Sequence, residues 1–229
     1  TAGATLYVTT NKGWRSHYDL DWNNKGAGAL LTYGVFDDGD DEWIKKEPSL
    51  TLSYAKRLGQ TPVTYRLYSE YGRWYGGGIH SNHWQYGITA AHDTIPFHGY
   101  GLDLAAGYSI TRESYNHSRV QGFNASAYLT KKFNDRFAAY IGGVYTKSTK
   151  QNALFAFDQE DYAKVLLMGM SYRLDERNRI GVGTKYAMDP HKWTDVDYYW
   201  FHDLHCSQII LRYRSEQDSW KIKWEFTPW

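Results

Sequence analysis

The sequence has little of what several protein classes require. Its 229 residues include one cysteine, Cys206, which excludes an internal disulfide and a cysteine-rich zinc site. Proline is scarce, and no apolar run approaches the roughly 18–20 residues that a membrane-spanning helix needs. Lys and Arg (26) nearly balance Asp and Glu (25), so no charge excess indicates a nucleic-acid partner.

Aromatic residues, in contrast, are abundant. The chain contains 10 Trp, 21 Tyr and 9 Phe, yet its mean hydropathy is only -0.65. The strands of a transmembrane β-barrel turn alternate residues towards lipid and towards a polar lumen, and Trp and Tyr collect at the lipid–water interfaces. A polar average combined with many aromatics therefore favours this class.

Apolar and polar residues alternate with period two along most of the chain. The aromatics share a face with Leu, Ile and Val, which indicates an outer surface in lipid rather than a sugar-binding interior of a soluble lipocalin-like barrel. The last segment shows the pattern: Trp220, Ile222, Trp224 and Phe226 alternate with Lys221, Lys223, Glu225 and Thr227.

Turn signals divide the chain into segments of strand length. We predict an all-β fold, a transmembrane antiparallel up-and-down barrel of about 14 strands, within a range of about 12–16, forming one domain over residues 1–229 in the bacterial outer membrane. An even count places both ends of the barrel chain on the periplasmic side. The predicted strands are 3–10, 14–22, 27–37, 48–58, 62–75, 83–95, 99–113, 119–132, 137–149, 159–174, 179–188, 193–201, 204–214 and 219–228.

Signatures of nucleotide binding and acyl transfer do not occur in the sequence. Gly76–Gly78 joins two strands, so we interpret it as a flexible external loop. Histidines three apart, such as His202 and His205, point to opposite faces of a strand and do not converge on a metal. His92, Asp93 and a nearby Ser are the residues for an enzyme alternative, but their spacing does not single them out. We expect no enzyme activity, no cofactor and no metal site.

The segment YYWFHDLHCSQIILRYR, followed by a last strand ending WKIKWEFTPW, resembles the C-terminal end of the LPS-assembly outer-membrane protein family (LptD-like). The matching turn residues are Asp203, Leu204, His205 and Cys206. The resemblance implies a barrel that passes lipopolysaccharide into the outer leaflet, and therefore membrane lipid and lipopolysaccharide as partners. It also implies a plug lipoprotein, periplasmic LPS-transport components and a periplasmic domain, which we expect to lie outside this chain.

The resemblance further implies a lateral seam between the first and last strands. Residues assigned to the seam are Leu6, Val8, Trp220, Ile222, Trp224, Phe226 and Pro228. Candidate ligand-binding residues in the lumen and at the seam are Arg66, Lys185, Arg212, Arg214, Lys221 and Lys223. Two alternatives stay open: a diffusion pore for small polar solutes, and lumenal charges that only pair with acids such as Glu70, Asp103 and Glu225.

Overall fold

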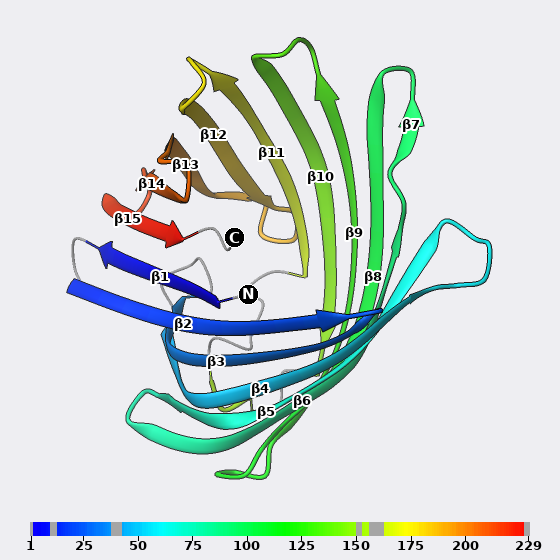
Figure 1. Ribbon diagram of the computed structural model, residues 1–229, viewed down its shortest axis with the longest axis vertical. Coiled ribbons are helices and arrows are strands. Elements are labelled where there is room, and N and C mark those ends of the chain that lie inside the picture. Colours follow the sequence, from blue (N-terminus) through cyan, green and yellow to red (C-terminus); the bar gives the residue numbers. More distant parts are fainter. Residues whose placement is uncertain (1, 10–12, 38–42, 150–152, 156–162, 227–229) are drawn as a thin grey trace.

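A computed structural model describes residues 2–9, 13–37, 43–149, 153–155 and 163–226, and its strands form one antiparallel sheet closed on itself (Figure 1). No helix long and apolar enough to cross a membrane occurs in these ranges. The strands are β1 (Ala2–Thr9), β2 (Gly13–Asn24), β3 (Ala27–Asp37), β4 (Trp43–Arg57), β5 (Val63–Gly76), β6 (Ile79–His92), β7 (Ile95–Phe97), β8 (Tyr100–Glu113), β9 (Arg119–Lys132), β10 (Phe137–Ser148), β11 (Lys164–Arg173), β12 (Asn178–Ala187), β13 (Lys192–Asp203), β14 (Ser207–Arg214) and β15 (Ser219–Phe226).

The ring has 14 strand positions, because β6 and β7 share one. β6 pairs with the later part of β8, up to Glu113, and the short β7 pairs with its first residues, Tyr100–Leu102. The other strands pair with their neighbours in the chain, except that β1 and β15 also pair with each other. The predicted all-β, antiparallel, up-and-down barrel of about 14 strands is therefore confirmed.

β1 and β15 close the ring and lie side by side in Figure 1. Five residue pairs join them, from Thr5 opposite Glu225 to Thr9 opposite Lys221. This pairing is antiparallel, so β1 starts at the barrel end where β15 finishes. We call this end the terminal end and the other the distal end.

The outer face carries the large apolar side chains. Trp14, Leu52 and Ile88 are 70%, 54% and 44% exposed, although each lies inside a regular strand. Tyr213 and Trp220 contact each other at the distal end of the last hairpin, and Trp224 contacts Phe226 at its terminal end. An outward apolar band with aromatics at both edges is the surface that a bilayer requires.

Three turns at the terminal end share one chemistry. The side chains of Asn134, Asp175 and Asp203 each accept hydrogen bonds from backbone N–H groups two or three residues further on, at 2.8–2.9 Å. Short polar side chains stabilise tight turns in this way, and the resulting geometry sets the register of the flanking strands. These turns lie where the sequence predicted them.

Several predicted boundaries differ from the structure by a few residues, and two of these differences have a clear physical reason. The predicted loop at 76–82 is a two-residue turn of Gly77 and Gly78, both at positive φ, because glycine alone adopts this conformation freely and so permits a tight hairpin. β4 starts at Trp43 rather than at residue 48, since a register shift between Lys46 and Ser49 accommodates Pro48 without ending the strand.

Candidate functional site

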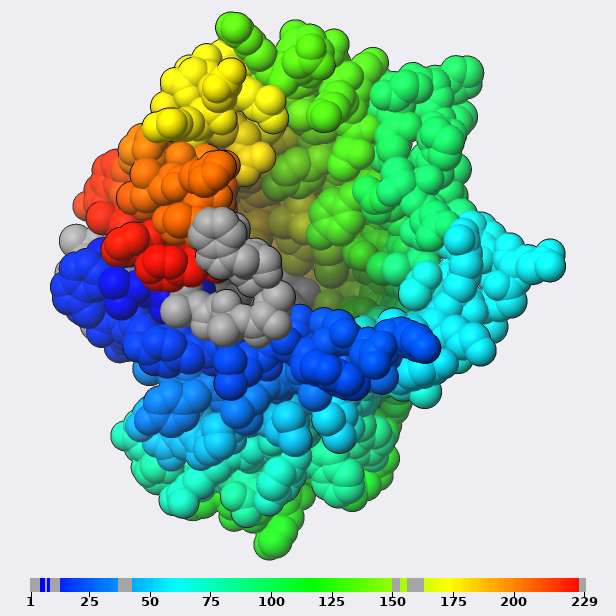
Figure 2. Space-filling view, in the orientation of Figure 1, coloured from blue at the N-terminus to red at the C-terminus, as the bar shows by residue number. Residues whose placement is uncertain are grey.

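The inner face of the barrel is the candidate functional site, and Figure 2 shows a hollow between β13–β15, β9–β12 and β2. Because the strands are paired in register, inward side chains form rows around the wall. Lipid-facing rows alternate with them, so register decides which polar side chains enter the lumen. One inward row contains Lys132, Ala138, Ser171, Gly181, Tyr199, Arg212 and Lys221.

Two arginines of β14 form ion pairs with aspartates of β13. Arg214 Nε lies 2.7 Å from Asp195 Oδ2, and both side chains are almost fully buried. Arg212 Nη2 lies 2.7 Å from Asp197 Oδ2, which also accepts a hydrogen bond from the Tyr199 hydroxyl at 2.9 Å. Both arginines are thus held by fixed carboxylates and are not free to bind a solute anion.

A second charged cluster lies on β4 and β5. Glu70 Oε1 is 2.6 Å from Lys46 Nζ and accepts a hydrogen bond from the Ser49 hydroxyl at 2.6 Å. The strand order places β13 seven positions from β5 in either direction, so the two clusters lie on opposite walls. Both are near the distal end. Fixed charges therefore face each other across this part of the lumen.

An aromatic stack lies beside the second cluster. Trp74 of β5 stacks on His83 with ring centroids 3.5 Å apart, and His83 Nδ1 bonds to Glu113. Phe155, which belongs to the connection between β10 and β11, packs against Trp74 with centroids 6.1 Å apart and contacts Ile44 of β4 in the same cluster. β10 and β5 are four positions apart around the ring. The connection after β10 thus places the apolar ring of Phe155 against the wall formed by β4 and β5.

Sequence reasoning missed this stack. The alternation placed Trp74 in a strand, but Phe155 lies in a segment without periodicity, and its contact with β5 depends on a fold around the ring. A usable signal was the apolar run ALFAF at residues 153–157, which is flanked by polar residues in the connection.

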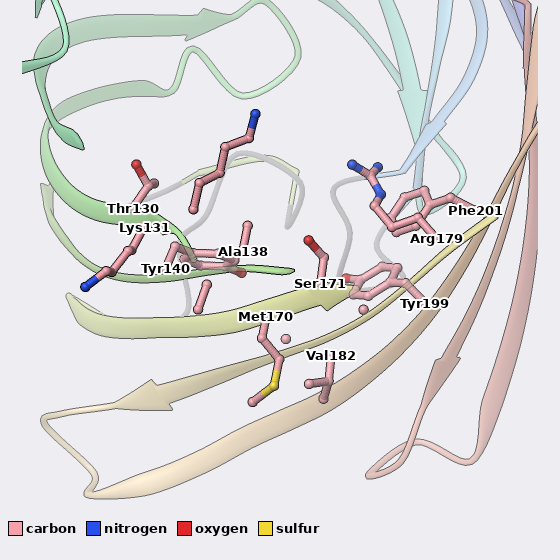
Figure 3. A pocket seen from close by; sticks show the side chains of 14 residues that line it. Thr130, Lys131, Ala138, Tyr140, Met170, Ser171, Arg179, Val182, Tyr199 and Phe201 are labelled. Atoms are coloured by element: carbon pink, nitrogen blue, oxygen red, sulfur yellow. The ribbon is translucent and has the colours of Figure 1, made fainter. Parts of the chain in front are cut away.

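A cavity of about 520 Å³ lies against β9–β13 (Figure 3). The wall of the cavity is thin at Gly181 and Gly183 because these residues carry no side chain. The rings of Tyr140 and Tyr199 also line the cavity. Figure 3 shows Ser171 and Arg179 on one side of the ribbons and Met170 and Val182 on the other. The lumenal side of the cavity is therefore polar and aromatic.

The other predicted lumenal cations have separate environments. Arg66 is exposed on β5, on the same side as Glu70. Lys185 lies directly opposite Asp195 in the register of β12 and β13. Lys221 Nζ is 5.4 Å from the centre of the Trp43 ring, and Lys223 forms an ion pair with Glu225. The structure thus places all of these cations on the inner face but does not gather them at one point.

The residues assigned to a lateral seam form regular pairs. Leu6 lies opposite Trp224 and Val8 opposite Ile222, and these side chains belong to the lipid-facing rows, as do Trp220 and Phe226. Pro228 lies outside the described residues. The β1–β15 junction is hydrogen-bonded like the other strand pairs, although it is short.

The turn that carried the family resemblance has a local explanation. Asp203 accepts a hydrogen bond from the His205 N–H, His205 adopts a φ of 80°, and Leu204 donates its N–H to the carbonyl of Ser207 at 2.8 Å. Cys206 is exposed. An aspartate that caps a tight turn is general turn chemistry, since Asp175 does the same in this chain, and so it identifies no family.

The residues of the enzyme alternative do not form a catalytic set. Asp93 pairs with Arg57, and His92 Nδ1 lies 2.6 Å from the backbone carbonyl of Asp93 rather than from its carboxylate. Across the described ranges, no three His, Cys, Asp or Glu side chains gather as metal ligands.

No family model and no curated relative matches the chain. Solved structures match over nearly its whole length. Omp33 of Acinetobacter baumannii gives a TM-score of 0.54 at 9% identity, covering 99% of this chain and 96% of that one. The KdgM porin in complex with disordered oligogalacturonate gives 0.46 at 9% identity with 100% coverage of both. The Pseudomonas putida toluene transporter TodX gives 0.48 at 9% identity, covering 98% and 86%.

At these identities the likeness shows the fold, which is that of an outer-membrane β-barrel. The chain is an outer-membrane barrel whose apolar outer face contacts lipid. The predicted membership of the LPS-assembly family is wrong, and so is the predicted insertion of lipopolysaccharide, because the fold matches a different outer-membrane protein, Omp33, over 96% of that protein's chain. Lipopolysaccharide, a plug lipoprotein and periplasmic transport components therefore have no support as partners.

Proposed function

We propose that the chain forms a passive diffusion pore for small polar solutes in the outer membrane. The observation that carries the proposal is the inner face of the closed ring, where ionisable side chains stand on opposite walls beside an unfilled cavity. Polar walls keep water and hydrated solutes in a lumen, while a closed ring shields them from lipid.

The distal half of the lumen sets the selectivity of such a pore. The ion pairs of Arg212 and Arg214 face the Lys46–Glu70 pair across the lumen, and the packed side chains of Trp74 and Phe155 narrow the same region. Charges fixed on opposite walls create a field across the path, which favours solutes with polar groups over apolar ones. The bulky side chains of Trp74 and Phe155 limit the size of the solutes that can pass.

Purified protein in planar bilayers tests the proposal. We expect steady single-channel conductance, and liposomes that contain the protein should swell in small sugars but not in large polysaccharides. Conductance no greater than that of detergent-treated empty bilayers would refute a pore.

A disulfide lock separates a pore from a protein that opens sideways. Val8 and Ile222 are direct cross-strand partners, so V8C and I222C in a C206S background are close enough to form a disulfide between β1 and β15. We expect equal conductance before and after reduction, because solutes pass through the lumen. Loss of conductance in the oxidised protein would contradict the proposal. The C206S protein is the control.

A further inference from the structure

Two arginines face the lumen at the terminal end of the cavity. Arg173 of β11 and Arg179 of β12 are direct cross-strand partners. Residues directly opposite each other in an antiparallel pair have their Cβ atoms about 5 Å apart, so like charges at such positions repel and destabilise the strand pair. In the parts of the chain that the structure describes, neither arginine has a carboxylate partner. The carboxylate of nearby Asp175 is occupied by the N–H groups of its own turn and by the Asn178 side chain.

An aromatic wall adjoins the arginine pair. The Arg179 guanidinium carbon lies 4.3 Å from the centre of the Phe201 ring, and Phe201 is its cross-strand partner on β13. Tyr199 is the next inward residue of β13 and lines the same cavity. Arg173 lines a smaller recess of about 140 Å³ that shares Arg179 and Phe201 with the main cavity. The acids Asp175, Glu176 and Asp203 also line this recess, whereas no Asp or Glu of the described residues lines the main cavity. Cations and ring faces thus border one space.

The size of this space suits a ring-sized ligand. The floor of the cavity is made by Ala138, Ser171 and Gly181, which are neighbours in one inward row and have the shortest side chains. A volume of about 520 Å³ lies within the range of small-molecule sites in proteins. Lys132 borders the side opposite Tyr199, which adds a third cation to the rim.

We propose that this space is a binding site for a small carboxylate attached to a six-membered ring. The carboxylate lies between Arg173 and Arg179, where it removes their mutual repulsion and accepts charge-assisted hydrogen bonds. The ring lies over Ala138 and Gly181 with its flat face against Phe201 or Tyr199. The site rests on the proposed pore, since the lumen is the route by which such a solute arrives.

Isothermal titration calorimetry of the whole protein in detergent tests the site without using conduction. The probes are glucuronate and benzoate, which distinguish a sugar acid from an aromatic acid, with glucose as the neutral control. We expect at least one acid to bind and glucose not to bind. We expect R179Q to raise the Kd of that acid about tenfold, because a charge-assisted hydrogen bond is lost.

Two further variants separate this site from general effects. R66Q removes one lumenal charge from β5, on the opposite wall, and we expect it to change the Kd less than about twofold because screening weakens distant charges. F201L keeps the arginines but removes the aromatic ring, so we expect it to weaken binding of the acid that carries a ring. Acetate has a carboxylate but no ring, so as an added probe it should bind F201L and the unmodified protein with the same Kd.

The outcomes are distinguishable from those of the pore test. Binding of neither acid, equal binding of acid and glucose, or equal losses in R179Q and R66Q would overturn the site. Any of these results together with normal conductance leaves the pore intact, whereas binding without conductance supports the site and refutes the pore.

Discussion

Removing the buried ion pair between Arg214 and Asp195 is the most exacting test of the lumenal architecture, because the free energy of unfolding depends directly on it. The two side chains are 3% and 5% exposed. Removing one partner of a buried pair leaves an uncompensated charge and costs about 3–5 kcal/mol. In R214M the Asp195 carboxylate still accepts backbone N–H groups from Val196 at 2.8 Å and from Glu216 at 3.3 Å, so we expect the lower limit, about 3 kcal/mol.

A double-mutant cycle isolates the pair itself. D195N together with R214M removes both charges, and we expect the double variant to be more stable than R214M by about 1–2 kcal/mol, because no buried charge is then left alone. The exposed pair Lys164–Asp189 is a matched control, with its atoms 3.3 Å apart and its side chains 53% and 50% exposed. Its cycle should give a coupling energy below about 1 kcal/mol.

Reversible urea unfolding of the protein in lipid vesicles, followed by tryptophan fluorescence, measures these free energies. The reasoning is refuted if the free energy of unfolding of R214M is within about 0.5 kcal/mol of that of the unmodified protein, which is the normal range for a surface substitution. A coupling energy equal to that of the exposed control would refute it as well.

Three further predictions concern the lumen and its turns. F155A should raise single-channel conductance and reduce the free energy of unfolding by about 3 kcal/mol, whereas F133A, at an exposed ring, should do neither. G169A should destabilise the barrel by about 1–3 kcal/mol because its Cβ would lie 2.6 Å from a tyrosine ring, while G183A, across the strand pair, should be tolerated. Hydrogen bonds from Asn178, and from the backbone of residues 177 and 178, lower the pKa of Asp175, so D175N should destabilise the barrel near neutral pH. In unfolding measured against pH, this difference should shrink as acid protonates Asp175; a difference that persists unchanged would contradict the assignment.

Local chemistry made most of the fold predictable. Period-two alternation from Trp220 to Phe226 depends only on a strand between lipid and water, so it is visible in the sequence and recurs in β15. Turns such as that of Asp175 depend on residues two or three apart. The misleading segment was the turn at Asp203, because an aspartate-capped turn, which also occurs at Asp175 in this chain, was interpreted as the signature of one family.

The candidate site was less predictable because its contacts join distant residues. Arg212 and Arg214 were predicted as ligand-binding residues, but register places them against Asp197 and Asp195. Arg173 and Arg179 are adjacent only because a short turn pairs β11 with β12.

The sequence by itself determined that this protein is a β-barrel of the outer membrane, since alternation, aromatic load and turn residues each act within one strand or turn. Only the tertiary structure decided which lumenal charges neutralise one another, where Phe155 packs, and which cations are left beside an open cavity. The physical reason is that the strand register and the closure of the ring bring together residues whose separation in the chain carries no signal of their contact.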